Sequence, residues 1–393
     1  MADFPTRLAV SILASMLVAP VFAQNTPARE PLPREELQSL AAVFTMLRQE
    51  YVTQTDAPAM IRDAIRGMVR GTDREAGEYF GPAEFREFKE GRAARSDAAI
   101  GVEVMRRDTQ LVLTTVSGGP AGAAGIRSGD VLHAVDGRRC GELAVNQVLD
   151  LLRGPLGSRV ALTVFRESSL TVETISVERK AFALARPAVT RPAPGVAMLR
   201  IVAFQEATLA DAVDALRAAW QAQAFSAVIL DLRGNLGGLV ETSVGVAAMF
   251  LPEGAVVANA SGRTPESQQV YRAVKDNYGR RLARDPLADL PSAVRSLPLA
   301  VLVDGSTAAG AEIVAAALQE HKRALVLGEQ TIGRGSIQTV RPLSPNDGLK
   351  YTTAYWTSPG GSRIHGVGVR PDVVMPAMSD QVVDAAVRRL LPG

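Results

Sequence analysis

The sequence contains few of the residues on which several common kinds of site depend. Cys140 is the only cysteine among 393 residues, so no disulfide can form within the chain. The three histidines, His133, His321 and His365, are far apart and lack the spacing of metal ligands. The formal net charge is only +2, so no basic excess points to a nucleic acid as partner. We therefore expect no metal, no other cofactor and no nucleic-acid partner.

Long hydrophobic runs are also missing, except near the start of the chain. There, Arg7 precedes an apolar run from Leu8 to Val18, and "VFA" stands before Gln24. This pattern predicts a secretory signal peptide, residues 1–23, cleaved after Ala23. The alternative is an N-terminal membrane anchor, but the run is shorter than the about 20 residues that a span requires. We expect an exported protein, periplasmic if the host is a Gram-negative bacterium.

The remaining chain is long enough for two or three domains. Residues 35–95 show apolar positions at helical spacing, as in "LQSLAAVFTMLRQEYV", and predict a helical N-terminal region. Residues 96–168 contain short alternating runs such as "QLVLTTV" and "RVALTVFRE", together with the helical stretch "AVNQVLDLLRG". These runs predict a compact β-rich module.

Residues 181–393 have a different texture, in which apolar strands alternate with amphipathic helices. Examples are "VAMLRIVAF", "LADAVDALRAAWQAQ", "AVILDLRG" and "VETSVGVAAMFL". The alternation predicts an α/β domain. Residues 261–297 are polar and rich in turns, which is typical of a long excursion or a lid.

Two glycine-rich loops lie in the α/β region, "DLRGNLGG" at 231–238 and "GEQTIGRG" at 328–335. The second loop superficially fits a phosphate loop, but Arg334 and Gly335 stand where a nucleotide site needs Lys followed by Ser or Thr. We therefore expect no nucleotide. In the first loop, Gly237 and Gly238 permit either exposed N–H groups or simply a tight turn from strand to helix.

A third segment, "GSTAAGAEI" at 305–313, follows the apolar run "PLAVLVD" and leads into a predicted helix beginning at Ala309. A strand, a tight turn and a helix in this order often present a nucleophile. The only hydroxyl groups in the segment belong to Ser306 and Thr307.

The β-rich module resembles a PDZ domain of the bacterial protease type. The resemblance rests on "AIGVEV", "GGPAGAAGIRSGDVLHAVDG" and "LLRGPLGSRVALTVFRE", in that order. A PDZ domain captures the C-terminus of a protein or peptide as an added β-strand. By this resemblance, Ile100, Gly101 and Val102 would form the loop for the carboxylate and the edge of the strand. The alternative is a β-module that only packs against its neighbour.

Nearly the whole mature chain resembles the carboxyl-terminal processing peptidases, also called tail-specific proteases. The motifs are "DLRGNLGG", "DGSTAAGAEIVAAALQEHKRALVLGEQTIGRGSIQ" and "YTTAYWTSPGGSRIHGVGVRPD", in that order behind the PDZ-like module. The resemblance implies an α/β core like that of crotonase or Clp protease, with an inserted PDZ domain and a helical N-terminal region. It also implies a serine nucleophile and a lysine base. The segment "TDREAGEYFGPAEF" departs from the family's usual Asp-Pro-His-Ser-like turn.

At the catalytic positions the chain departs from this family. The family's serine run resembles Ser-Ala-Ser-Ala-Ser-Glu, and Glu312 sets the register so that the nucleophile corresponds to Ala309. The lysine of a later Gly-Lys-Gly corresponds to Arg334, and Gln338 matches the glutamine that orients this lysine. Both members of the dyad are therefore substituted. Serine to alanine is a common engineered change, but the independent change at Arg334 favours natural loss.

The resemblance also assigns an oxyanion hole to the Gly310 N–H and to an N–H of Gly237 or Gly238. A surviving hole without a nucleophile indicates a protein that binds peptides without cutting them, as a decoy or an adaptor for an active relative. Two alternatives stay open. One is an active endopeptidase with relocated residues, in which Ser306 or Thr307 acts with Lys322 or His321. The other is a decaying paralogue without function.

Overall fold

The computed structural model describes residues 32–89, 100–107, 109–116, 118–143, 145–180, 185–280, 282–377 and 380–391. The predicted signal peptide, residues 1–23, lies outside these residues. The chain divides into two units, Met1–Ile61 and Arg62–Gly393, and helix α2 begins in the first and continues into the second. Within the described residues, no helix combines the length and the apolar character needed to cross a bilayer.

The region predicted as helical contains three helices and one short strand in its described part, residues 35–89. Its elements are α1 (Arg34–Glu50), α2 (Ala57–Thr72), β1 (Glu78–Phe80) and α3 (Pro82–Lys89). The helical pattern did not predict β1, which pairs with the distant strand β16 (Gly348–Thr357) and buries Tyr79 and Phe80. Because β1 precedes the β-rich module and β16 follows it, the module is an insertion in the surrounding domain.

The inserted module is a small antiparallel sheet with two helices. Its elements are β2 (Val102–Arg107), β3 (Gln110–Thr115), α4 (Pro120–Ala123), β4 (Val131–Val135), β5 (Arg138–Arg139), α5 (Val145–Leu152), β6 (Arg159–Arg166) and β7 (Thr171–Glu178). The strand order is β2-β3-β4-β6-β7, and β5 pairs with β4. The module extends beyond the predicted boundary at 168, because β7 pairs with the whole of β6 and buries Val177 in the module's own core.

The α/β core is built on a second sheet, with the order β17-β14-β13-β10-β9-β8 in the described part of the chain. Its strands are β8 (Ala188–Ala193), β9 (Val196–Arg200), β10 (Ala227–Asp231), β13 (Leu299–Val303), β14 (Leu325–Gly328) and β17 (Val373–Val374). Every residue of β10 and β13 is buried, as expected of parallel strands covered on both faces.

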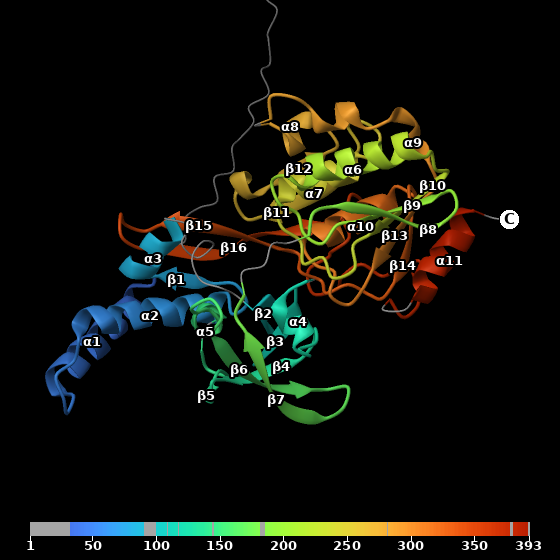
Figure 1. Ribbon diagram of the computed structural model, residues 1–393. Helices are drawn as coiled ribbons and strands as arrows, with labels where there is room; N and C mark the ends of the chain where they lie inside the picture. The colour runs from blue at the N-terminus through green and yellow to red at the C-terminus, as the bar shows by residue number, and fades with distance from the viewer. Residues whose placement is uncertain are drawn as a thin grey trace, which may run out of the picture. The chain divides into compact units, whose positions relative to one another are not determined.

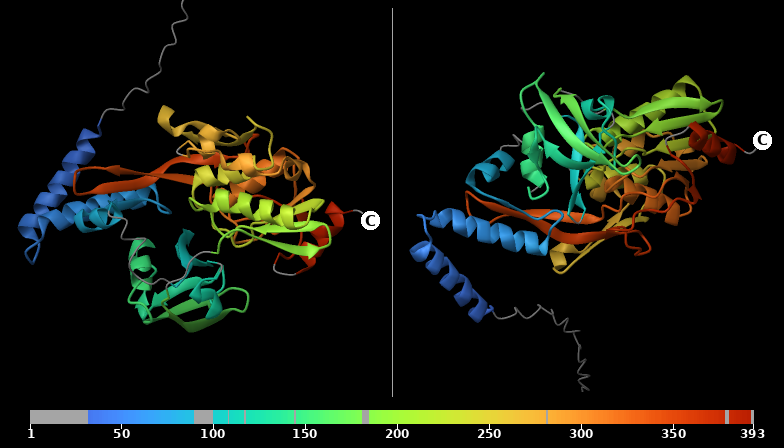
Figure 2. Two further views of the ribbon diagram at one scale, coloured as in Figure 1. Left: turned by 45° about the horizontal axis from the view of Figure 1, so that its top comes forward. Right: turned by 90° about the horizontal axis from the view of Figure 1, so that it is seen from below.

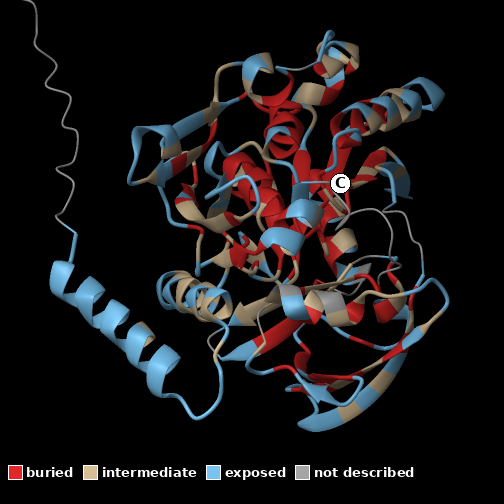
Figure 3. Ribbon diagram, turned by 90° about the vertical axis from the view of Figure 1, so that its left-hand side faces the viewer, coloured by how far each residue is buried: buried red, intermediate tan, exposed pale blue. Residues whose placement is uncertain are grey.

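Helices cover both faces of this sheet (Figure 1). Helices α6 (Thr208–Ala222), α7 (Val240–Ala248) and α10 (Gly310–Glu320) pack on one face. Helix α11 (Asp380–Leu390), predicted from "DQVVDAAVRRLL", packs on the other through Val382, Ala386 and Leu390. Figure 3 shows buried residues concentrated in these layers. The predicted fold class, an α/β core with an inserted β-rich domain and a helical N-terminal region, is confirmed.

A third sheet joins distant parts of the chain. It has the order β1-β16-β11-β12, with β15 (Ser336–Pro342) pairing with β16, and Figure 2 shows β15 and β16 as a long ribbon. Residues 261–297, predicted as a long excursion or a lid, contain the end of β11 (Val256–Gly262), all of β12 (Gln269–Arg272), and helices α8 (Lys275–Tyr278) and α9 (Ser292–Ser296). The segment is a long excursion between β11 and β13, and Leu287, Leu290 and Val294 pack it against the core.

One buried ion pair holds the inserted module together. Arg166, at the end of β6, donates from Nε and Nη2 to the two carboxylate oxygens of Asp130 at 2.9 and 2.7 Å. The two residues are only 7% and 2% exposed. A bidentate pair in this setting is costly to break, because either partner alone would be a buried charge.

We predict that Arg166→Leu lowers the free energy of unfolding by about 3 kcal/mol, because Asp130 stays buried without its counter-charge. The control is Arg159→Leu at the exposed start of the same strand, which should cost about 0.5 kcal/mol. Urea unfolding followed by circular dichroism measures both. Equal effects of the two substitutions would contradict the assigned role of the pair.

Candidate functional site

Three loops meet at one edge of the core sheet. They follow β10, β13 and β14, which are parallel neighbours, and they comprise residues 232–239, 304–309 and 329–335. Because parallel strands present their carboxyl ends at the same edge, both glycine-rich loops and the "GSTAAGAEI" turn converge there. This edge is therefore where the sequence-predicted site residues of the core come together.

Ala309 occupies a strained turn between β13 and α10. Its φ and ψ are 50° and −116°, a conformation that non-glycine residues rarely adopt. Ala308 and Gly310 are buried, whereas Ala309 is half-buried. The strand, the strained turn and the helix reproduce the arrangement that presents a nucleophile, with a methyl group at the presented position.

The first glycine-rich loop lies directly against this turn. A Cβ added to Gly237 would be 2.7 Å from the Ala309 Cβ and 2.9 Å from the Gly310 nitrogen, so no larger residue fits. The Gly237 N–H is already used, since it donates to Asn235 Oδ1 at 2.8 Å. The N–H groups of Gly238 and Gly310 have no hydrogen-bond partner among the described residues. Of the two candidates in this loop, Gly238 is thus the one with a free donor.

The carboxylate of Glu312 connects the turn to the second glycine-rich loop. One oxygen accepts the N–H groups of Ala309 and Arg334 at 2.8 and 2.7 Å. The other accepts the Gly333 N–H at 2.6 Å and the Thr331 hydroxyl at 2.5 Å. Glu312 is fully buried, and burial raises its pKa although these donors act in the opposite direction. The two substituted positions therefore share one carboxylate oxygen as their backbone anchor.

The Arg334 side chain reaches the inserted module. Its Nη1 forms an ion pair with Glu103 on β2, while Nε and Nη2 are buried and have no hydrogen-bond partner in the described part of the chain. Gln338, predicted to orient the base, is exposed and donates to Ser336 Oγ at 2.8 Å. Among the described residues, no hydrogen bond joins Gln338 to Arg334.

The structure does not assemble the alternative catalytic residues. Thr307 is fully buried, and its hydroxyl is held by Asp304 Oδ1 and the Leu232 carbonyl, each at 3.0 Å. His321 and Lys322 follow the far end of α10, about 16 Å from its first turn at 1.5 Å per residue. Neither residue is therefore placed to take a proton from residue 306 or 307.

Asp231 anchors the start of the first glycine-rich loop. Its fully buried carboxylate accepts Arg200 Nη1 at 2.7 Å and two nitrogens of Arg233 at 2.8 Å each. Burial alone would raise the pKa of Asp231, but the two arginines outweigh this effect and the pKa lies below its ordinary value. The charged form of Asp231 is therefore favoured in the folded protein, and it holds the loop through its bonds to both arginines.

The predicted peptide-binding residues lie at the start of β2. Ile100 is buried, and its carbonyl accepts the Ala121 N–H at 2.7 Å. Gly101 has a φ of 72°, and Val102 begins the strand. Strand β2 is an edge strand of the module's sheet, and helix α5 packs beside it. An edge strand next to a helix is the geometry in which a peptide can be added as a further strand.

Three residues of the site were not predicted as such. Asn235 holds the Gly237 N–H, and its position inside "DLRGNLGG" is a signal that could have identified it. Thr331 donates to Glu312 and accepts the Val369 N–H at 2.7 Å. Glu103 lies about 230 residues before its partner Arg334, and no local pattern indicates it. No group of three or more candidate metal ligands occurs among the residues that the structure describes.

Comparisons with known proteins agree with this geometry. The family model described as peptidase family S41 matches residues 195–375, and a PDZ-domain model matches residues 112–166. A carboxy-terminal-processing protease of Bartonella bacilliformis is 30% identical over 93% of this chain and 80% of its own. Carboxy-terminal processing protease CtpA of Bacillus subtilis is 28% identical over 86% of this chain and 68% of its own. The solved photosystem II D1 C-terminal processing protease superposes with a TM-score of 0.71 and 27% identity, over 90% of this chain and 91% of its own.

We predict that Asp231→Asn lowers the free energy of unfolding by about 2 kcal/mol at pH 7, because charged hydrogen bonds to two arginines are lost. The folded-state pKa of Asp231 is lowered, so its stabilisation is present above the unfolded pKa of about 3.9 and is lost as the pH falls through the folded value. The difference between variant and natural protein should therefore shrink at about pH 3 in urea unfolding. Asp214→Asn, at an exposed i,i+3 pair, is the control. A difference that is independent of pH would contradict the assignment.

Proposed function

The chain belongs to peptidase family S41, the family of the carboxy-terminal processing serine proteases, and from this membership we propose that it is a pseudopeptidase. In this proposal it binds the C-terminal tails of proteins or peptides and does not cleave them. The single observation that carries the proposal is Ala309 in the strained turn where the fold presents a nucleophile. A methyl group cannot attack a carbonyl carbon.

The substitution at residue 334 supports the same conclusion independently. A guanidinium group stays protonated at physiological pH, so Arg334 cannot accept a proton from a serine. Its side chain is also turned to Glu103 in the inserted module. Restoring a serine alone would thus leave the site without a base.

The donors that remain are suited to holding a peptide. Among the described residues, the N–H groups of Gly238 and Gly310 and the Nε and Nη2 groups of Arg334 have no hydrogen-bond partner. Gly238 is exposed, so its N–H is open to a ligand, whereas Gly310 and the two Arg334 nitrogens are buried. Buried donors without partners in a folded protein call for an acceptor, and a peptide carbonyl or carboxylate supplies one. The site thus keeps hydrogen-bond donors that can hold a peptide, but it has no nucleophile and no base.

The inserted PDZ domain provides the first contact with the tail. A peptide added to the free edge of β2 would place its carboxylate at Ile100 and Gly101. Because Glu103 lies on the same strand and pairs with Arg334, occupation of this edge is linked to the substituted site. We propose that the protein acts as an adaptor or decoy, for which an active peptidase relative is the expected partner.

The place of action is a further part of the proposal. The N-terminal sequence, with Arg7 before an apolar run and "VFA" before Gln24, supports export and cleavage after Ala23. In a Gram-negative host the mature protein would act in the periplasm, where active relatives of the family and unfolded tails would be its encounter partners.

The proposal is tested by restoring the dyad. We expect the mature protein to leave an unstructured substrate with an apolar C-terminus intact, and the double variant Ala309→Ser with Arg334→Lys to cleave it. The single variant Ala309→Ser is the control, and it should stay inactive because Arg334 cannot act as base. Mass spectrometry of products and labelling with a serine-directed fluorophosphonate measure activity. Cleavage or labelling of the natural protein would support the alternative with relocated residues Ser306 or Thr307.

Peptide binding is tested separately. We predict that a fluorescent peptide with an apolar C-terminal residue binds the mature protein, and that amidation of its carboxylate weakens binding at least tenfold, because the loop amides lose a charged acceptor. Fluorescence anisotropy gives both dissociation constants. A stably folded protein that binds neither peptide would favour the paralogue without function.

A further inference from the structure

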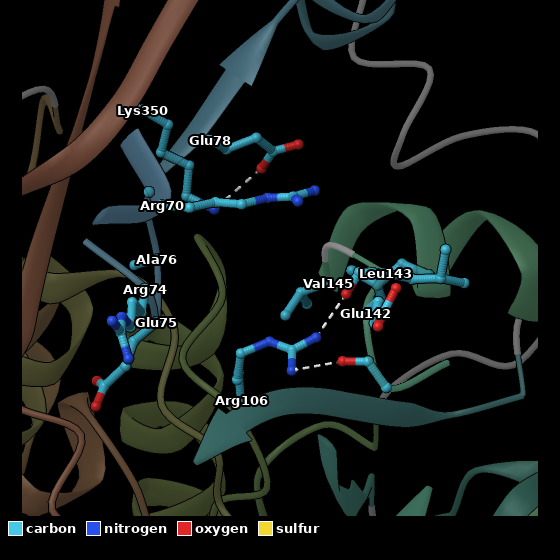
Figure 4. A pocket seen from close by; sticks show the side chains of 13 residues that line it. Arg70, Arg74, Glu75, Ala76, Glu78, Arg106, Glu142, Leu143, Val145 and Lys350 are labelled. Atoms are coloured by element: carbon cyan, nitrogen blue, oxygen red, sulfur yellow. Dashed lines mark hydrogen bonds and ion pairs between the residues drawn. The ribbon is translucent and has the colours of Figure 1, made fainter. Parts of the chain in front are cut away.

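A cavity of about 340 Å³ lies beside β2 and α5 of the PDZ domain. Its walls come from the end of α2 and the start of β1, from β16, and from β2 and α5 of the module (Figure 4). Val145 and Leu149 of α5 line the cavity and also pack on the module's core beside β2. The cavity therefore borders both β2 and α5, the two elements beside which a peptide would be added.

Charged side chains of both signs line the cavity, and the cations outnumber the anions by one. The cations are Arg70, Arg74, Arg106 and Lys350, and the anions are Glu75, Glu78 and Glu142. Lys350 lies 3.8 Å from Glu78, but Arg70 and Arg74 have no ion-pair partner among the described residues. Figure 4 shows the Arg70 side chain extended across the space, with Arg106 rising from β2 on the opposite side.

Arg106 is held in place without a counter-charge. Its guanidinium donates to the carbonyl oxygens of Gly141 at 3.0 Å and Leu143 at 2.5 Å. Burial lowers the pKa of Arg106, and the nearby positive charge of Arg70 lowers it further. These two like charges face one cavity, so an anion placed between them would relieve their repulsion.

The direction of a bound peptide identifies which part of it reaches this cavity. A peptide added to β2 runs antiparallel to it, with the carboxylate at Ile100 to Val102 and the preceding residues towards Arg106. Arg106 lies four positions after Val102 on the strand. Because paired strands advance together residue by residue, the peptide residue beside Arg106 is about four positions before the C-terminus.

We propose that this cavity is a subsite for an acidic side chain located about four residues upstream of the C-terminus of the bound peptide. This inference rests on the proposed binding of C-terminal tails by the PDZ domain. It adds a selectivity that the carboxylate loop alone does not provide, namely for tails that combine an apolar terminus with an upstream Asp or Glu. Arg70 supplies an exposed charge, and Arg106 supplies a charge that is held by two backbone carbonyls.

The experiment uses the full mature protein and a set of fluorescent ten-residue peptides that share one apolar C-terminal residue. Each peptide has a single Glu at one upstream position, and its matched partner has Gln there. We expect Glu to bind about fivefold more tightly than Gln near the fourth upstream position, as one partly exposed ion pair allows, and the advantage to shrink in 0.5 M NaCl.

Two variants test whether Arg70 causes the preference for Glu over Gln. Arg70→Gln should remove most of the preference for Glu, because Arg70 is exposed on α2 and has no other ion-pair partner in the described chain. Arg107→Gln is the matched control, since it removes the same charge from the next residue of β2, which points to the opposite face. An equal loss in both variants would mean a general charge effect and would overturn the subsite.

Different results would contradict the acidic subsite and the binding of C-terminal tails. If Glu and Gln peptides bind equally at every position, the subsite is wrong and the binding of tails stands. If no peptide binds, both the proposed function and the subsite are wrong. Fluorescence anisotropy at fixed ionic strength provides all of these comparisons.

Discussion

The carboxylate of Glu312 is the group on which the arrangement of the site depends. It is fully buried, and it accepts the backbone N–H groups of Ala309, Gly333 and Arg334 and the hydroxyl of Thr331. A buried carboxylate is tolerated only when such donors surround it. Glu312 therefore forces the turn after β13 and the loop after β14 into contact, and it keeps Ala309 in a strained conformation that an alanine would not otherwise adopt. None of these interactions involves the side chain of residue 309 or 334. The arrangement of these backbone groups is therefore independent of which side chains stand at residues 309 and 334.

The same loop connects the core to the inserted module. Arg334 is anchored at its backbone by Glu312 and at its side chain by Glu103, so one residue joins the substituted site to the edge strand β2. A lysine at this position would have one ammonium group, which cannot both serve as a base and remain paired with a carboxylate. Arginine stays protonated and can keep the ion pair with Glu103. Under the proposed function, this ion pair couples the binding of a peptide at β2 to the position of Arg334 in the site.

Much of the architecture could be predicted from the sequence, because its elements have strong local patterns. Fully apolar runs became β10 and β13, and "LADAVDALRAAWQAQ" became α6. The elements that were missed depend on partners far away in the chain. Strand β1 has three residues and forms only because β16 pairs with it, and the polar, turn-rich pattern of residues 261–297 does not show that Leu287 and Val294 pack on the core. Arg106 of the inserted module and Arg70 of the surrounding domain likewise line one cavity only because one domain is inserted in the other.

The sequence by itself determined the family and the order of the domains, and it shows alanine at residue 309 and arginine at residue 334. Family and domain order follow from local motifs and their spacing, and the identity of a side chain is visible without coordinates. Only the tertiary structure decided how the remaining groups are used. The Gly237 N–H donates to Asn235, whereas the Gly238 N–H has no hydrogen-bond partner among the described residues. Gln338 is exposed, and Arg334 forms an ion pair with Glu103. The physical reason is that hydrogen bonds and ion pairs depend on distances of about 3 Å between groups, and these distances are set by the packing of segments that are remote in the chain.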